Sequence, residues 1–125
     1  GRECRCPPLC RPCVAPGTNR AYIEAGIDIL GHPGLITDQE CELAAKNSVC
    51  LEITTRKGHS LTNGHVAAAA KRHGARLVVN NDAHGPGDLV SPELAEKIVL
   101  GAGLAREDFR EMQRTSEGLI EKLRF

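Results

Sequence analysis

The sequence predicts an α/β fold in which successive βα units build one sheet of parallel strands. From Val14 onward, short aliphatic runs alternate with stretches of helical periodicity, which is typical of repeated βα units. The chain has two Phe, one Tyr and no Trp, so its core has to consist of Val, Ile, Leu and Ala. Buried parallel strands are rich in these residues. The 125 residues correspond to one domain of ordinary size.

Three short aliphatic runs are the expected strands, and a helical pattern separates each from the next. In chain order they are Ile27–Leu30, Val49–Ile53 and Leu77–Asn80. Runs this short, bounded by turn residues, favour strands over helices. The order of strands and helices therefore predicts a parallel sheet.

Capping residues mark the first two expected helices. A short helix over Asn19–Ala25 is followed by Gly26, a residue type favoured just past a helix end. Thr37, with Glu40 three places later, matches a capping box. The helix that this box opens is expected to continue to about Asn47.

Three further helices are expected in the second half of the chain: Gly64–His73, Pro92–Leu100, and one or two amphipathic helices over Arg106–Arg124. Thr62 is the expected cap of the first, which Gly74 ends. Ser91 is the expected cap of the second, and Pro92 occupies its first helical position, where proline is favoured.

Charge and hydropathy exclude several classes of protein. Sixteen Lys and Arg balance sixteen Asp and Glu, so no overall field attracts nucleic acid or an acidic membrane. Single-strand binders also need stacking aromatic rings, which are scarce here. No apolar run approaches the roughly 18 residues that span a bilayer, and the N-terminal segment lacks the apolar region of a signal peptide. We therefore expect a cytoplasmic protein without a membrane or nucleic-acid partner.

The N-terminal segment differs in composition from the rest of the chain. Residues 1–13 hold four of the six cysteines, namely Cys4, Cys6, Cys10 and Cys13. This segment is either a tetrahedral zinc site or a foreign or disordered stretch, and the domain is expected to cover residues 14–125. A disulfide framework would spread through the fold. Cys41 and Cys50 are instead expected to be small buried hydrophobic residues.

Polar residues with metal-binding side chains follow each predicted strand. His32 follows the first strand, His59 the second, and Asp82 and His84 the third. The carboxyl ends of parallel strands meet at one edge, where ligands bind in α/β folds. Asp82 and His84 are two residues apart, so an extended chain directs both side chains to one side. Mixed imidazole and carboxylate donors suit Zn, Mn or Fe(II), and the sequence therefore predicts a metal site.

Simpler interpretations exist for individual residues. A single His beside Pro and Gly is usually a turn residue, and Asp82 can cap a turn into Gly85. His65 and His73 lie in a predicted helix and are left out of the site. Glu52 lies inside the second strand, where it either orients ligands or substrate from behind or satisfies buried backbone groups.

Three blocks resemble the later motifs of the PHP (polymerase and histidinol phosphatase) superfamily, and they are most similar to its histidinol-phosphate-phosphatase-like branch. The blocks are DILGHPGLIT (28–37), LEITTRKGHSLTNGHV (51–66) and VVNNDAHGPGDLV (78–90). They occur in the order of the family, and the resemblance extends from Val14 to the end of the chain. The His-x-His strand, the Thr-Asp-His type motif and the bridging Glu with which the family begins are absent from this sequence.

The resemblance implies the C-terminal part of a distorted (β/α)7 barrel that holds up to three metal ions, Zn, Mn or Fe. Such enzymes hydrolyse phosphate esters through a metal-activated water. On this pattern His32 matches the histidine of a His-Pro motif, His59 the next histidine, and Asp82 with His84 an Asp-x-His motif. Arg56 and Lys57 either hold the substrate phosphate or are solvated loop cations.

The resemblance implies a small phosphorylated substrate, with histidinol phosphate as the leading candidate. Two alternatives are a nuclease or polymerase-associated module and a catalytically inactive fragment that keeps a metal-binding role. Part of a barrel leaves sheet edges unpaired, and such edges are prone to self-association.

Overall fold

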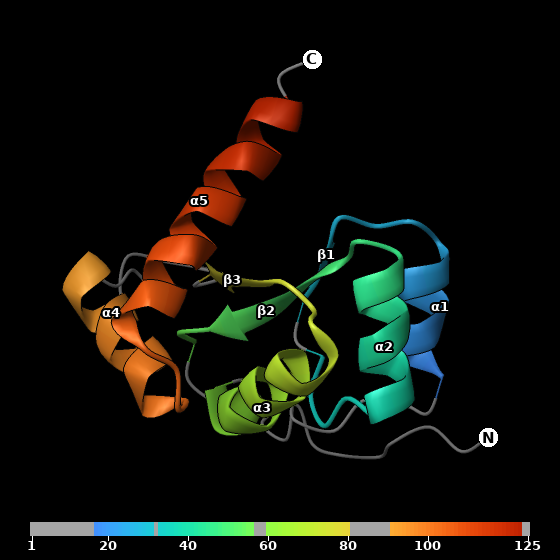
Figure 1. Cartoon of the computed structure of the whole chain (residues 1–125), viewed down its shortest axis with the longest axis horizontal. Coiled ribbons are helices and arrows are strands. Elements are labelled where there is room, and N and C mark those ends of the chain that lie inside the picture. Colours follow the sequence, from blue (N-terminus) through green and yellow to red (C-terminus); the bar gives the residue numbers. More distant parts are fainter. Residues whose placement is uncertain (1–16, 32, 57–59, 81–90, 124–125) are drawn as a thin grey trace.

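The computed structural model describes residues 17–31, 33–56, 60–80 and 91–123. These residues form a three-stranded parallel sheet, five α-helices and one short 3-10 helix (Figure 1). The elements in chain order are α1 (Thr18–Glu24), β1 (Ile29–Leu30), α2 (Asp38–Lys46), β2 (Cys50–Thr54), η1 (Ser60–Thr62), α3 (Asn63–His73), β3 (Leu77–Asn80), α4 (Pro92–Gly101) and α5 (Arg106–Leu123). The predicted α/β class with a parallel sheet is confirmed. Residues 1–13, the predicted separate segment, lie outside the described part.

The sheet has the strand order β1-β2-β3, with β2 in the centre. Leu30, the last residue of β1, pairs with Leu51, whereas Thr54 of β2 pairs with Asn80 of β3. All three strands run in one direction, so their carboxyl ends face the same edge of the sheet. β1 stops earlier along this edge than its two neighbours.

The first strand is shorter than the sequence predicts, since it begins at Ile29 and not at Ile27. In the observed register Ile29 pairs with Cys50, so Ile27 would need a partner at Ser48. Ser48 has a left-handed backbone with φ of 58°, because the chain turns there before it enters β2. The second strand begins one residue later than predicted, and β3 has the predicted bounds.

Two of the predicted helix caps form as expected. In the capping box of α2, the backbone N–H of Glu40 donates to Thr37 Oγ1 over 3.1 Å, and the N–H of Thr37 donates to Glu40 Oε1 over 2.9 Å. The N–H of Leu94 donates to Ser91 Oγ at the start of α4. The helix bounds agree with the prediction within one residue, apart from Arg124, which lies outside the described residues.

Thr62 occupies the predicted N-cap position of α3, but it does not cap the helix through its side chain. Its side chain makes no capping hydrogen bond, and α3 begins at Asn63. An N-cap residue normally has an extended backbone, as Thr37 has with ψ of 161°. Thr62 has ψ of 5° because it belongs to η1, which leads directly into α3. Gly74 ends α3 in the left-handed conformation, as predicted.

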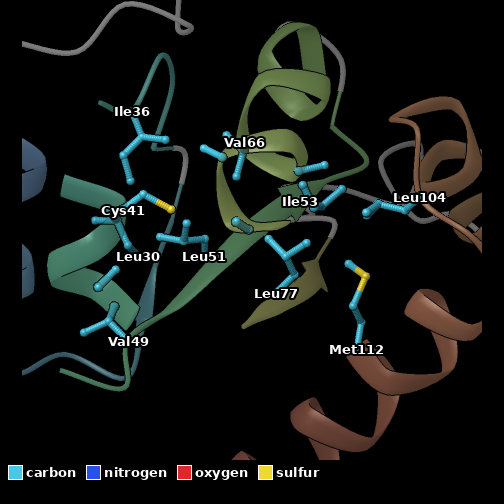
Figure 2. Close-up of a cluster of buried hydrophobic side chains, with 14 of the residues drawn as sticks. Leu30, Ile36, Cys41, Val49, Leu51, Ile53, Val66, Leu77, Leu104 and Met112 are labelled. Atoms are coloured by element: carbon cyan, nitrogen blue, oxygen red, sulfur yellow. The ribbon is translucent and has the colours of Figure 1, made fainter. Parts of the chain in front are cut away.

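All five helices contribute to one hydrophobic core, which lies on one face of the sheet (Figure 2). The core takes Leu51 and Ile53 from β2 together with side chains from α1 to α5, including Val66 of α3 and Met112 of α5. Side chains alternate between the faces of a strand. Cys50, Glu52 and Thr54 therefore point to the opposite face, and they are buried as well.

Cys41 and Cys50 are free thiols in the interior. Burial raises the pKa of Cys41 and of Cys50, which keeps both thiols protonated near neutral pH. They pack as small hydrophobic residues, as predicted. Within the described residues, no helix combines the length and the apolar character needed to cross a bilayer.

Candidate functional site

The topology fixes where the predicted metal ligands stand along the chain. His32 follows the end of β1 by two residues, His59 follows β2 by five, and Asp82 and His84 follow β3 by two and by four. The strands are parallel and neighbouring, so all four positions follow strand ends that face one edge. The four side chains themselves lie outside the described residues, as does Lys57. The metal site stays a prediction.

The segment that leaves β1 is held by Asn19 and passes close to Glu52. Asn19, a residue of α1 that is only 3% exposed, donates from Nδ2 to the backbone carbonyl of Pro33 over 2.8 Å. Pro33 is fully buried. On the other side, a Cβ atom added to Gly31 would lie 3.8 Å from Glu52 Oε1. The backbone after His32 is therefore tied to α1, and the Glu52 carboxylate lies near the backbone before it.

Glu52 occupies the central strand and is 5% exposed. Its carboxylate lies on the face opposite the helices and close to Gly31 at the β1 exit. A buried carboxylate needs polar partners, and Glu52 does take part in a polar interaction. It thus places a carboxylate beside the residue that precedes His32.

The segment that leaves β2 is held by Asn63 at the start of α3. The Asn63 side chain accepts a hydrogen bond from the backbone N–H of Thr54 at Oδ1 over 3.2 Å, and its Nδ2 donates to the Thr54 carbonyl over 2.7 Å. Thr54 Oγ1 in turn accepts from the backbone N–H of Arg56 over 3.2 Å. The backbone of Arg56, a candidate phosphate-binding residue, is therefore fixed to the strand end. Arg56 is partly buried and takes part in a further polar interaction.

A cavity of about 270 Å³ lies beside the end of β3. It is lined by Thr55, Val79, Asn80, Ser91, Pro92, Ala95, Phe109 and Gln113. Thr55 and Val79 share the sheet face of Leu51 and Ile53, so the cavity lies between the sheet and the helices α4 and α5. The buried hydroxyl of Thr55 has no hydrogen-bond partner in the described part of the chain.

A second cavity, of about 230 Å³, lies at the opposite end of β3. Its lining includes Leu77 at the start of β3, Gly74 at the end of α3, and Asp108 and Met112 of α5. It is therefore remote from the strand ends that precede the predicted ligands. Its position gives no reason to include it in the site.

The two described histidines have structural partners. His65 Nε2 lies 2.6 Å from the backbone carbonyl of Ile36. His73 lies between two carboxylates of α2, with Nε2 2.9 Å from Asp38 Oδ1 and Nδ1 3.4 Å from Glu42 Oε1. His73 therefore links α3 to α2. Within the described residues, no three His, Cys, Asp or Glu side chains are grouped closely enough to hold a metal ion.

The sequence reasoning missed Asn19, Asn63 and Thr55. None of them belongs to a residue type that by itself indicates metal binding. The only available signal is position, since Asn63 lies inside one of the three family-like blocks and Asn19 in the stretch 14–26 before them. The roles of the two asparagines depend on contacts with backbone groups of other segments.

Comparison with known proteins identifies relatives of greater length. An uncharacterized protein of Methanocaldococcus jannaschii is 43% identical over 88 residues, which cover 70% of this chain and 40% of that protein. A protein of Shewanella frigidimarina named "Probable phosphatase" is 31% identical over 131 aligned positions, or 90% of this chain and 52% of that protein. A protein of Shewanella piezotolerans with the same name is 30% identical, with 90% of this chain and 51% of that protein covered.

The chain thus spans about half the length, or less, of these curated relatives. No family model matches the chain. No solved structure matches it either.

Proposed function

We propose that the chain is part of a metal-dependent phosphoesterase that hydrolyses a small phosphomonoester. One observation carries the proposal: three neighbouring parallel strands end at one edge, and each is followed by His or Asp residues that can bind metal. Two relatives named "Probable phosphatase" support the phosphatase class. We infer that the chain acts in the cytoplasm.

The donor set fits a transition metal. Zn, Mn and Fe(II) accept imidazole and carboxylate ligands together. This chain offers three imidazoles and one carboxylate, from His32, His59, His84 and Asp82. A bound metal would supply an activated water at neutral pH and would neutralise phosphoryl oxygens. Up to three metal ions would require more donors than these four residues provide. The remaining donors would come from the part of the relatives that this chain does not cover.

Three residues around the strand ends have proposed roles that fit this chemistry. Arg56, whose backbone is fixed by Thr54, and Lys57 would bind the substrate phosphate through charge-assisted hydrogen bonds. Glu52 would orient the β1 exit and the His32 ligand from behind, since its carboxylate lies beside Gly31. Outer groups of this kind are common behind metal ligands.

We further propose that the sheet is a segment of a distorted (β/α)7 barrel. In a βα barrel the helices lie on the outer face of the strands, whereas a doubly wound sheet has helices on both faces. All five described α-helices contribute to the core on a single face. This one-sided arrangement supports the barrel, with Glu52 and Thr54 on its inner side.

Histidinol phosphate is the first substrate to test. The assay measures Mn²⁺-dependent release of inorganic phosphate from histidinol phosphate and from a simple aryl phosphate. It uses this chain and the longer M. jannaschii relative, with Asp82→Ala in this chain and the corresponding change in the relative as controls. We expect release in the longer protein that requires metal and is lost in its variant. Turnover that persists after the metal is chelated, or in the Asp82→Ala variant of an active protein, would contradict the proposal.

A further inference from the structure

We propose that Asn19 and Asn63 are positioning residues for the metal ligands His32 and His59: Asn19 fixes the backbone directly after His32, and Asn63 closes the loop that carries His59. This inference rests on the proposed function, because it assumes that these histidines bind metal. The two asparagines are 3% and 6% exposed. Asn19 makes one hydrogen bond to the main chain just after β1. Asn63 makes two to the main chain at the end of β2.

The end of β2 has backbone groups that the sheet itself does not satisfy. Backbone N–H groups along a strand alternate in direction: Cys50 donates toward β1, to Asp28, whereas Leu51 and Thr55 donate toward β3. By this alternation the N–H and C=O of Thr54 face the β1 side. β1, however, ends at Leu30, opposite Leu51. Two buried backbone groups would thus lack a strand partner, which is costly in a protein interior.

The carboxamide of Asn63 takes the place of the missing strand. Its Oδ1 accepts from the N–H of Thr54, and its Nδ2 donates to the carbonyl of the same residue. A carboxamide has the same donor and acceptor groups as a peptide unit, so this pair continues the β-ladder past the end of β1. The contact joins residues nine positions apart, and His59 lies in the loop that it closes.

Asn19 has the corresponding role at the β1 exit. Its Nδ2 donates to the carbonyl of Pro33, the residue directly after His32. Pro33 disfavours helical geometry at His32, and Asn19 ties the position of the proline to α1. The asparagines therefore act on separate loops, and each loop carries one predicted ligand.

Such anchoring matters because metal ligands must be held close to their final geometry before the metal binds. A loop that is freed from its anchor has to be ordered at the moment of binding, and this lowers the affinity for the metal. Loss of an outer hydrogen bond behind a ligand typically reduces metal affinity by about 10- to 100-fold.

The test is a calorimetric titration of Mn²⁺ into the full chain and three variants, with the melting temperature of each metal-free protein measured in parallel. Mn²⁺ is preferred over Zn²⁺ because the thiolates of the Cys-rich segment favour zinc. The variants are Asn19→Ala, Asn63→Ala and the control Val49→Ala. Val49 is buried just before β2, at the end of the sheet opposite the strand exits. Its truncation lowers stability without touching either loop.

We expect both asparagine variants to lose about 10-fold or more in Mn²⁺ affinity, while Val49→Ala keeps the affinity of the unmodified chain despite a lower melting temperature. If Asn63→Ala does not fold, Asn19→Ala, which removes a single hydrogen bond, decides alone. Unchanged affinity in the folded asparagine variants overturns the inference, as does an equal loss in Val49→Ala. Absence of Mn²⁺ binding in the unmodified chain is a different result, since it overturns the proposed metal site itself.

Discussion

Thr54 and Thr55 are adjacent threonines with different hydrogen bonding at the end of β2. Both are buried. Thr54 Oγ1 accepts from the N–H of Arg56, whereas the Thr55 hydroxyl finds no partner among the described residues. A buried polar group without a partner loses its hydration and gains nothing in return. The two residues therefore allow a hydrogen-bonded buried hydroxyl to be compared with one that has no partner, at neighbouring positions.

Replacing each threonine by valine should therefore change stability in opposite directions. Valine keeps the size and the β-branched shape. We expect Thr55→Val to raise the free energy of unfolding by about 1 kcal/mol and Thr54→Val to lower it by about 1 kcal/mol. Urea denaturation measures both values. Equal destabilisation by the two changes would show that the Thr55 hydroxyl has a partner after all.

At the scale of the elements, β2 determines how the sheet and helices fit together. All five of its residues are buried, and it pairs with a strand on each side. Leu51 and Ile53 contribute to the core with the helices, and Glu52 occupies the opposite face. A continuous buried run is what a central parallel strand requires.

Truncation of the central strand should be costly. Leu51→Ala removes a fully buried side chain and leaves a cavity, and we expect it to lower the free energy of unfolding by about 3 kcal/mol. The matched control is Leu100→Ala, because Leu100 in α4 is exposed and should change stability by less than about 0.5 kcal/mol. Denaturant titration measures the free energy of unfolding of both variants. Similar decreases in the two would contradict a central role of Leu51 in the core.

Ion pairs with Asp38 of α2 and Asp108 of α5 connect α3 to these helices and make stability dependent on pH. The pKa of Asp38 is lowered by a hydrogen bond from Arg72 and then by one from His73. The pKa of Asp108 is lowered by Lys71 and then by the backbone N–H of Ala105. A carboxyl group with a lowered pKa in the folded state binds protons less readily than it does in the unfolded chain.

The sign of the pH effect follows from this difference. The stabilisation from both aspartates should be complete above the unfolded pKa of about 4. It should be lost as the pH falls through the lower pKa of the folded state. Urea midpoints measured between pH 5 and pH 2 test this, with the double variant Asp38→Asn and Asp108→Asn as the comparison. If the double variant shows the same decrease in urea midpoint at low pH, the pH dependence arises from other groups.

At the scale of the whole molecule, the described sheet is open at β1 and β3. β1 is two residues long, and its Ile29 is 38% exposed. An outer strand with an exposed apolar side chain is a template for pairing with another chain. The relatives are longer than this chain. In the proposed barrel, strands outside this chain would pair with this edge. In Figure 1 the C-terminal part of α5 also projects beyond the sheet.

The chain is therefore expected to self-associate through the β1 edge when it is studied alone. Ile29→Lys places a charge on this edge, and edge charges oppose strand pairing. We expect the variant to stay monomeric at concentrations at which the unmodified chain forms larger species, as measured by sedimentation velocity. Leu94→Lys, at an exposed position of α4, is the control. Equal effects of the two substitutions would indicate general solubilisation and not an edge contact.

The sequence alone determined the features that depend on near neighbours. The capping box of Thr37 and Glu40, the Ser91 cap and the Gly74 helix end all arise from contacts within a few residues, so their patterns could be read directly. The parallel sheet was also predictable, because alternating strand and helix patterns permit few other arrangements.

Only the tertiary structure decided which distant groups meet. The backbone turn at Ser48 delayed the start of β1. At its other end, β1 stops at Leu30, and this leaves Thr54 facing the Asn63 carboxamide. Asn19 reaches a carbonyl fourteen residues away, and His73 meets carboxylates more than thirty residues earlier. Periodicity and spacing carry no information on such pairs, since each depends on how whole elements pack against one another.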